Sequence, residues 1–235
     1  MLEENLSCKI LEVESEMVQK RIDNAIPELL TIKDRVRIYN TKFPNWSKLH
    51  VHNNLIYGFW IIGSWHNTAA ERGISFYGAY PPHYLERVRT LFPDCRKVLH
   101  LFSGVVEKQY EGEVTFDINP ECNPDICGDV RKLRHYFSEG EFDLILADPP
   151  YEERDFKIYG YKPFSKPAVI KDCYYITKKG GFLVWLDTRF PTFSKKYWNV
   201  IGTIGLVQST NHRVRMVTIF QKVIEKGGKN GRKFV

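Results

Sequence analysis

The apolar positions of residues 97–223 fall into short runs separated by polar and glycine-containing stretches, a pattern typical of buried strands that alternate with helices. Runs that predict strands cover residues 97–101, 114–116, 142–147, 181–186, 198–208 and 213–223. A helix is predicted from Pro81-Pro82 to Leu91, because proline is tolerated in a first helical turn. Together these elements predict an α/β fold with a mostly parallel sheet and a C-terminal antiparallel hairpin.

The first 75 residues show a different pattern. Residues 1–35 are predicted to be helical, since apolar side chains recur among many charges, whereas residues 36–75 are rich in aromatic and polar side chains. Periodicity does not decide whether Leu55–Gly63 forms a buried helix or a strand. We therefore predict a helical and aromatic N-terminal extension over residues 1–75, a main domain over 76–224, and a basic, flexible tail over 225–235.

The composition is that of a soluble globular protein, with 43% hydrophobic and 26% charged residues. No apolar run approaches the roughly 20 residues that a membrane span needs, so no membrane association is expected. The five cysteines are scattered and odd in number, which favours reduced thiols and a cytoplasmic location. Cys122 and Cys127 lack a second ligand pair at zinc spacing, so no metal site is predicted.

Charge is distributed unevenly along the chain. Residues 1–95 are neutral, residues 96–151 carry a net charge of −5 and residues 152–235 a net charge of +11, which gives the +6 of the whole chain. A basic final third favours a polyanionic partner, most simply nucleic acid. A lysine-rich solvated surface would produce the same balance, and charge alone leaves both interpretations open.

The segment Asp148-Pro149-Pro150-Tyr151 carries the strongest chemical signal. It directly follows an apolar strand, and its two prolines force an extended backbone. The Asp148 carboxylate and the Pro149 carbonyl would then accept the two N–H bonds of an exocyclic amine, while the Tyr151 ring stacks on the face of the base. Holding the amine in this way localises its lone pair for an in-line methyl transfer. The alternative is an ordinary turn at the end of a strand.

Residues 76–82, 100–104, 116–120, 127–130 and 148–151 form a series of segments in a fixed order. This series resembles the class I S-adenosylmethionine-dependent methyltransferases, and within them the amino-methyltransferases that act on nucleic-acid bases. The resemblance covers roughly residues 76–223 and implies a Rossmann-like methyltransferase sheet. It implies catalysis by Asp148, Pro149, Pro150 and Tyr151. It also implies that the cofactor, S-adenosylmethionine, contacts Tyr80, Pro81, Leu101, Phe102, Ser103, Gly104, Asp117, Ile118, Asp129, Val130 and Asp148.

Elementary chemistry agrees with these cofactor residues. A strand-end aspartate such as Asp117 can accept the two vicinal hydroxyls of a ribose, and Gly104 lets the backbone approach a ligand closely. Three neighbouring carboxylates would also favour a sulfonium cation. Alternatives are an Asx turn at Asp117 and a helix N-cap at Asp129. Only twelve residues separate Gly104 from Asp117, so either the first crossover helix is shortened or a loop replaces it.

Basic and aromatic residues near the expected crevice are candidates for substrate contact: Tyr159, Lys162, Arg189, Phe190, His212 and Arg213. We expect an enzyme that methylates the exocyclic amine of a base, with adenine N6 in DNA favoured over RNA. Two alternatives remain at this stage: an RNA methyltransferase acting on guanine N2 or adenine N6, and a non-catalytic nucleic-acid-binding subunit with the same fold. Assembly as a homodimer or with a partner subunit stays open.

Overall fold

The structure, a computed structural model, describes residues 30–45, 47–62, 80–108, 110–152, 155–156, 162–208 and 214–223. Its helices are α2 (Ile32–Lys42), α3 (Tyr84–Leu91), α4 (Leu133–Tyr136) and α6 (Lys166–Ile176), with 3-10 turns η2 (Pro120–Cys122) and η3 (Val130–Lys132). Its strands are β1 (Leu49–His52), β2 (Leu55–Ile62), β3 (Val98–Leu101), β4 (Glu113–Asp117), β5 (Ile126–Cys127), β6 (Phe142–Ala147), β7 (Thr177–Asp187), β8 (Trp198–Gln208) and β9 (Val214–Lys222).

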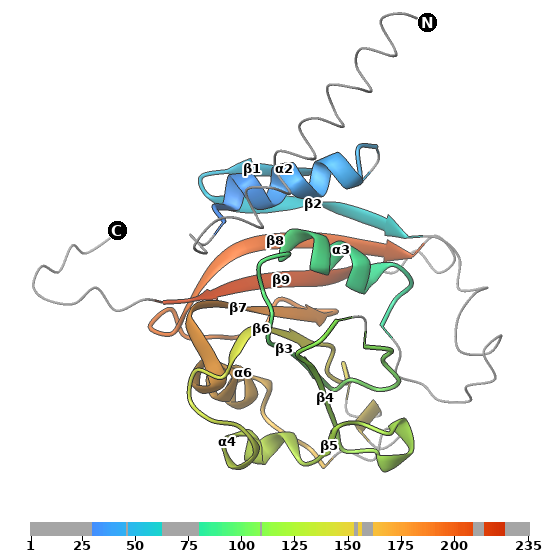
Figure 1. Ribbon diagram of the computed structural model, residues 1–235, viewed down its shortest axis with the longest axis vertical. Coiled ribbons are helices and arrows are strands. Elements are labelled where there is room, and N and C mark those ends of the chain that lie inside the picture. The colour runs from blue at the N-terminus through green and yellow to red at the C-terminus, as the bar shows by residue number, and fades with distance from the viewer. Residues whose placement is uncertain are drawn as a thin grey trace, which may run out of the picture.

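The described strands form one mixed sheet in the order β1-β2-β8-β9-β7-β6-β3-β4-β5 (Figure 1). Strands β7, β6, β3, β4 and β5 pair in parallel, and β9 runs antiparallel to both of its neighbours, β7 and β8. The predicted α/β fold, mostly parallel sheet and C-terminal antiparallel hairpin are therefore confirmed. The connection between β8 and β9, residues 209–213, lies outside the described residues.

The chain reverses its direction of travel across the sheet between β3 and β6. From β3 it proceeds outward to β4 and β5, and it then returns to the other side of β3 to form β6 and β7. In open sheets of this kind, ligands bind beyond the carboxyl ends of the strands at such a switch point. We therefore expect a ligand site at the residues that follow β3 and β6.

Residues from the expected N-terminal extension take part in the same sheet. Leu55–Ile62 forms a strand, β2, which pairs in parallel with β8, and β1 completes that edge. Of the predicted helix over residues 1–35, the described part is the start of α2, capped by the Thr31 side chain, which accepts a hydrogen bond from the Asp34 N–H. The division of the chain at residue 75 and the tail at 225–235 stay predictions.

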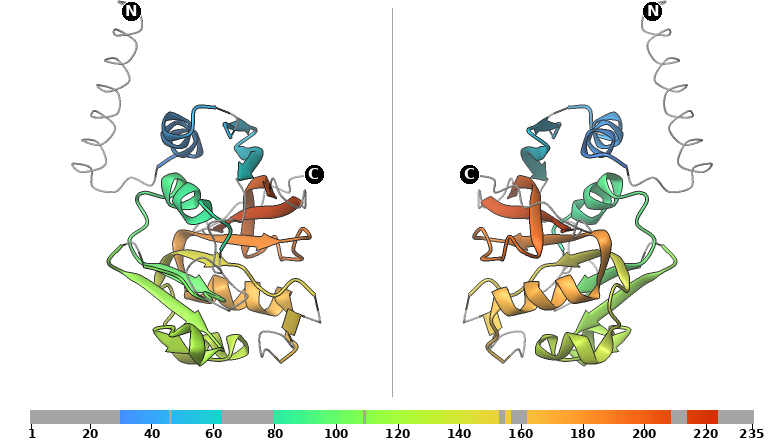
Figure 2. Two further views of the ribbon diagram at one scale, coloured as in Figure 1. Left: turned by 90° about the vertical axis from the view of Figure 1, so that its right-hand side faces the viewer. Right: turned by 90° about the vertical axis from the view of Figure 1, so that its left-hand side faces the viewer.

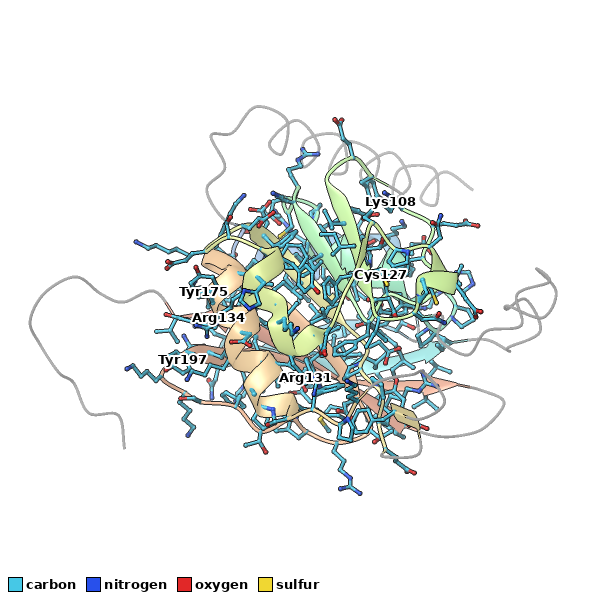
Figure 3. The ribbon with its side chains drawn as sticks, turned by 90° about the horizontal axis from the view of Figure 1, so that it is seen from below. Lys108, Cys127, Arg131, Arg134, Tyr175 and Tyr197 are labelled. Atoms are coloured by element: carbon cyan, nitrogen blue, oxygen red, sulfur yellow. The ribbon has the colours of Figure 1, made fainter. Side chains whose placement is uncertain are left out.

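Apolar side chains fill both faces of the sheet. Helices α2 and α3 cover one face (Figures 1 and 2). On that face Arg35 is fully buried between the rings of Phe92 and Phe182, and it bonds Asp94 through both terminal nitrogens, at 2.6 and 2.7 Å. Helices α4 and α6 cover the other face, and Arg134 of α4 lies 4.8 Å from the Tyr175 ring centroid of α6 (Figure 3).

A loop replaces the first crossover helix. Between Leu101 and Glu113, the described residues contain no helix, which settles the choice raised by the short spacing between Gly104 and Asp117. Among all described residues, no helix is long and apolar enough to cross a membrane.

Candidate active site

Four polar segments lie at one edge of the sheet. Strands β3, β4, β6 and β7 run parallel and end at Leu101, Asp117, Ala147 and Asp187, so the residues that follow them share that edge. Asp129 follows the short strand β5, whose Cys127 pairs with Asp117. The sheet thus brings Asp117, Asp129 and Asp148 to its carboxyl-end edge.

The Asp148–Tyr151 segment has a defined local geometry. The Tyr151 hydroxyl donates to Asp148 Oδ1 at 2.5 Å. The backbone N–H groups of Tyr151 and Glu152 both donate to Asp155 Oδ2, at 3.1 and 2.9 Å, which closes the turn after the segment. Pro149 and Pro150 are buried. Among the described residues Tyr151 makes the single hydrogen bond to the Asp148 carboxyl, so Oδ2 is left for a ligand donor.

Burial dominates the electrostatics of Asp148. It raises the pKa of this carboxyl from 3.8 to about 6, while the hydrogen bond from Tyr151 and the charge of Arg215 act against the rise. Burial also raises the pKa of the Tyr151 hydroxyl well above its usual range, and the Asp148 charge adds to that shift. At neutral pH the site therefore holds a largely ionised carboxylate beside a neutral phenol.

Two stacked tyrosines form a wall next to this carboxylate. The rings of Tyr80 and Tyr84 lie 5.3 Å apart, and the Tyr80 hydroxyl donates to the Leu146 carbonyl at 3.2 Å. Burial raises the pKa of the Tyr80 hydroxyl well above its usual range, and the charges of Asp148 and Asp117 raise that pKa further. The Asp148 and Asp117 carboxylates therefore both interact electrostatically with the Tyr80 hydroxyl. The Tyr84 hydroxyl is buried without a hydrogen-bond partner among the described residues.

The loop after β3 is tied to the end of β4. Asp117 accepts the Gly104 N–H at Oδ2 and the Asn119 N–H at Oδ1, both at 2.9 Å. Phe102 and Gly104 have positive φ angles of 59° and 52°, which bend the chain sharply at the switch point. Each Asp117 oxygen keeps a second lone pair, so this buried carboxylate can still accept hydroxyl donors.

Asp129 is turned toward its own chain. Its carboxylate accepts the Arg131 N–H as the N-cap of η3 and pairs with the Arg131 guanidinium at 2.6 Å. The hydrogen bond from the Arg131 side chain lowers the pKa of this carboxyl. Sequence analysis gave an N-cap at Asp129 as the alternative to a cofactor contact, and the structure shows that N-cap at the start of η3. Val130, the next residue, is buried in the core.

Two cations flank Tyr151, and the sequence did not single them out. The Arg215 guanidinium carbon lies 5.4 Å from the Tyr151 ring centroid and comes from β9. Lys166, the first residue of α6, bonds Asp187 at 2.7 Å and the Tyr151 carbonyl oxygen at 3.3 Å. Neither cation, nor the wall residue Tyr84, lies in a recognisable motif. Only the pairing of β7 with β9 and the start of α6 bring the two cations to the site.

The predicted substrate residues are distributed around the same edge. Arg189 and Phe190 are exposed and directly follow β7, and Lys162 is exposed ahead of α6. Tyr159, His212 and Arg213 lie outside the described residues.

No protein-family model matches this chain, and no curated protein matches it in sequence. Solved structures that are similar include TrmN from Thermus thermophilus, with 16% identity, a TM-score of 0.43 and coverage of 55% of this chain and 44% of that chain. N-methyltransferase NodS from Bradyrhizobium japonicum, in complex with S-adenosyl-L-homocysteine, has 14% identity, a TM-score of 0.43 and coverage of 66% and 96%. An rRNA methylase from Streptococcus thermophilus has 10% identity, a TM-score of 0.32 and coverage of 55% and 89%. At this level of likeness, the chemistry of this chain has to be inferred from its own residues.

Proposed function

We propose that this protein is an S-adenosylmethionine-dependent methyltransferase that methylates the exocyclic amine of a nucleic-acid base, with adenine N6 in DNA as the target. The observation that carries the proposal is the position of Asp148. Its carboxylate follows β6 at the switch point of the sheet and accepts the Tyr151 hydroxyl at Oδ1. No described residue donates a hydrogen bond to Oδ2, so this oxygen can accept one from a ligand. An oxygen in this position can accept an N–H of an exocyclic amine.

The residues beside the switch point fit the cofactor. Asp117 is buried at the end of β4, with a lone pair left on each oxygen for ribose hydroxyls. The bend at Phe102–Gly104 lets the backbone pass close to a ligand. Asp129 is engaged with Arg131, so contacts to the adenine ring would come from the half-buried Ile118 and from the backbone of Asp129. When bound, the cofactor supplies a methyl group on a positively charged sulfur.

The chain's own residues then orient the nucleophile. Asp148 Oδ2 accepts one N–H of the amine and the Pro149 carbonyl accepts the other, which directs the nitrogen lone pair along the line of transfer. Asp148 can also receive the proton that the nitrogen releases, because its pKa of about 6 places it closer to neutrality than an ordinary aspartate. Tyr151 holds Asp148 through its hydroxyl while offering its ring to the base.

The charge of the chain supports a nucleic-acid substrate. Residues 152–235 carry a net charge of +11, and two exposed cations of this part are Lys162, ahead of α6, and Arg189, directly after β7. These side chains can contact phosphates, which sets position without reading sequence. In duplex DNA the target base has to be flipped out, which costs a few kcal/mol.

Incubation with labelled cofactor and a mixture of DNA and RNA, followed by mass spectrometry of the nucleosides, tests this function. N6-methyladenine in the DNA fraction is the expected product. A methylated base in RNA alone would replace DNA by RNA as the substrate. If no base is methylated and titration calorimetry with the cofactor shows no heat, the chain is a non-catalytic subunit. Asp148→Ala serves as the control, with transfer lost and cofactor affinity within about tenfold.

A further inference from the structure

A partly buried ion pair lies beside the Asp148–Tyr151 segment. The Lys166 ammonium bonds Asp187 Oδ2 at 2.7 Å and the Tyr151 carbonyl oxygen at 3.3 Å, and it lies 6.0 Å from the Tyr151 ring centroid. The Asp187 side chain is 4% exposed and that of Lys166 is 22% exposed. One cation thus joins the end of β7, the start of α6 and the last residue of the candidate catalytic segment.

The stability of α6 does not explain a lysine at this position. Lys166 is the first residue of the helix after the N-cap Ser165, where the helix dipole disfavours a positive charge. Asp187, in turn, would be costly to bury without a cationic partner. The ion pair between Lys166 and Asp187 stabilises both of these charges, and the Lys166 ammonium also bonds the Tyr151 carbonyl oxygen.

The anionic partner of Lys166 is rigidly held. Asp187 Oδ2 also accepts the Trp185 indole N–H at 3.3 Å, and Oδ1 accepts the Thr188 backbone N–H at 2.7 Å. Trp185 is fully buried in β7. The ammonium of Lys166 is therefore fixed relative to the sheet.

The catalytic segment needs such an outside contact. Pro149 and Pro150 have no backbone N–H, so two consecutive residues cannot donate to neighbouring elements. The Tyr151 N–H donates to Asp155, within the following turn. Of the bonds that the described residues make to this segment, the one from Lys166 connects its backbone to α6 and, through Asp187, to β7.

We propose that Lys166, held by Asp187, is a positioning residue for the methyl-transfer site. It fixes the Tyr151 carbonyl, and thereby the direction of the side chain whose hydroxyl holds Asp148 Oδ1. This inference rests on the proposed function for its kinetic consequence, and the geometry of Tyr151 gives it a separate readout.

Four variants test the role: Lys166→Met, Lys166→Arg, Asp187→Asn and the double variant Lys166→Met/Asp187→Asn. Lys178→Met is the matched control, because Lys178 forms a 2.6 Å ion pair with Asp143 at the opposite end of β7. Lys166→Met should lower kcat about 100-fold, the loss typical of a displacement of about 1 Å at a reacting group, and leave KM for the cofactor within about threefold. Lys166→Arg should recover most of kcat, and Lys178→Met should resemble the wild type.

The double variant separates positioning from folding. It removes the uncompensated buried charge that Lys166→Met leaves at Asp187, so its melting temperature should recover while kcat stays as low as in Lys166→Met. Recovery of kcat along with stability would overturn the proposal, as would a kcat for Lys166→Met within about threefold of wild type. An equal loss in Lys178→Met would overturn it as well.

The NMR signals of the Tyr151 ring, assigned with Tyr151→Phe, supply the readout that needs no turnover. They should shift in Lys166→Met and stay unchanged in Lys178→Met. Unchanged Tyr151 signals in Lys166→Met would overturn the positioning role even in an active enzyme. If the wild type methylates no nucleic acid but these signals shift as expected, the proposed function fails while the positioning of Tyr151 by Lys166 stands.

Discussion

Replacing Asp148 by asparagine should stabilise the protein while removing its activity. The carboxyl is partly buried, and burial raises its pKa from 3.8 to about 6. An asparagine of nearly the same shape keeps an oxygen for the Tyr151 hydroxyl and has no charge to desolvate. Transfer should nevertheless fall by about 100-fold or more, because the carboxylate that orients the amine is lost.

The gain in the free energy of unfolding follows from the pKa shift. A rise of about two pKa units corresponds to about 3 kcal/mol at 1.4 kcal/mol per unit, and partial exposure of the carboxyl reduces this to about 1–2 kcal/mol. The native state binds the proton more tightly than the unfolded state. The ionised carboxyl therefore costs nothing below about pH 4, and wild-type stability falls relative to Asp148→Asn as the pH rises from 4 to 6.

Urea denaturation of both proteins at pH 4, 5, 6 and 7.5 measures this difference. The variant should match the wild type at pH 4 and exceed it by the full amount at pH 7.5. A variant that is less stable at pH 7.5, or a difference that does not change with pH, would refute the assignment of a desolvated carboxylate at Asp148.

Three further results are expected. Asp117→Ala should weaken cofactor binding in titration calorimetry by at least about tenfold, since the ribose acceptor is lost, and unchanged affinity would remove Asp117 from the cofactor site. Arg35→Met should lower the free energy of unfolding by about 3 kcal/mol in urea denaturation, because Asp94 loses a bidentate partner at the edge of the core, and a cost below about 1 kcal/mol would contradict this. Nucleic-acid affinity should fall steeply with salt, and Arg189→Ala should reduce the slope of log K against log salt by about one; an unchanged slope would exclude a phosphate contact at Arg189.

Much of the sheet was predictable because its strands are unusually apolar. The runs that became β3, β6 and β7 are buried on both faces, and such runs stand out in a sequence without any alternation. Strand β2 was not predictable in the same way. Its Trp60 and Ile62 face the core while Phe59 and Ile61 are exposed, and a short segment of this composition suits a helix equally well.

The candidate site was predictable where it follows a strand directly and unpredictable where it depends on tertiary contacts. Asp148 and Asp117 could be found because each ends an apolar run. The orientation of Asp129 was decided locally, by the Arg131 N–H and guanidinium two residues away. Lys166 and Arg215 lie far from Asp148 in sequence, and no local pattern indicates that α6 and β9 bring them to Tyr151.

A crystal structure with bound S-adenosyl-L-homocysteine would test the central claim most directly. The account predicts ribose hydroxyls on the Asp117 carboxylate and the sulfur near Asp148, beside the Tyr80–Tyr84 wall. Density for the ligand at any other part of the sheet, or none at saturating concentration, would contradict it.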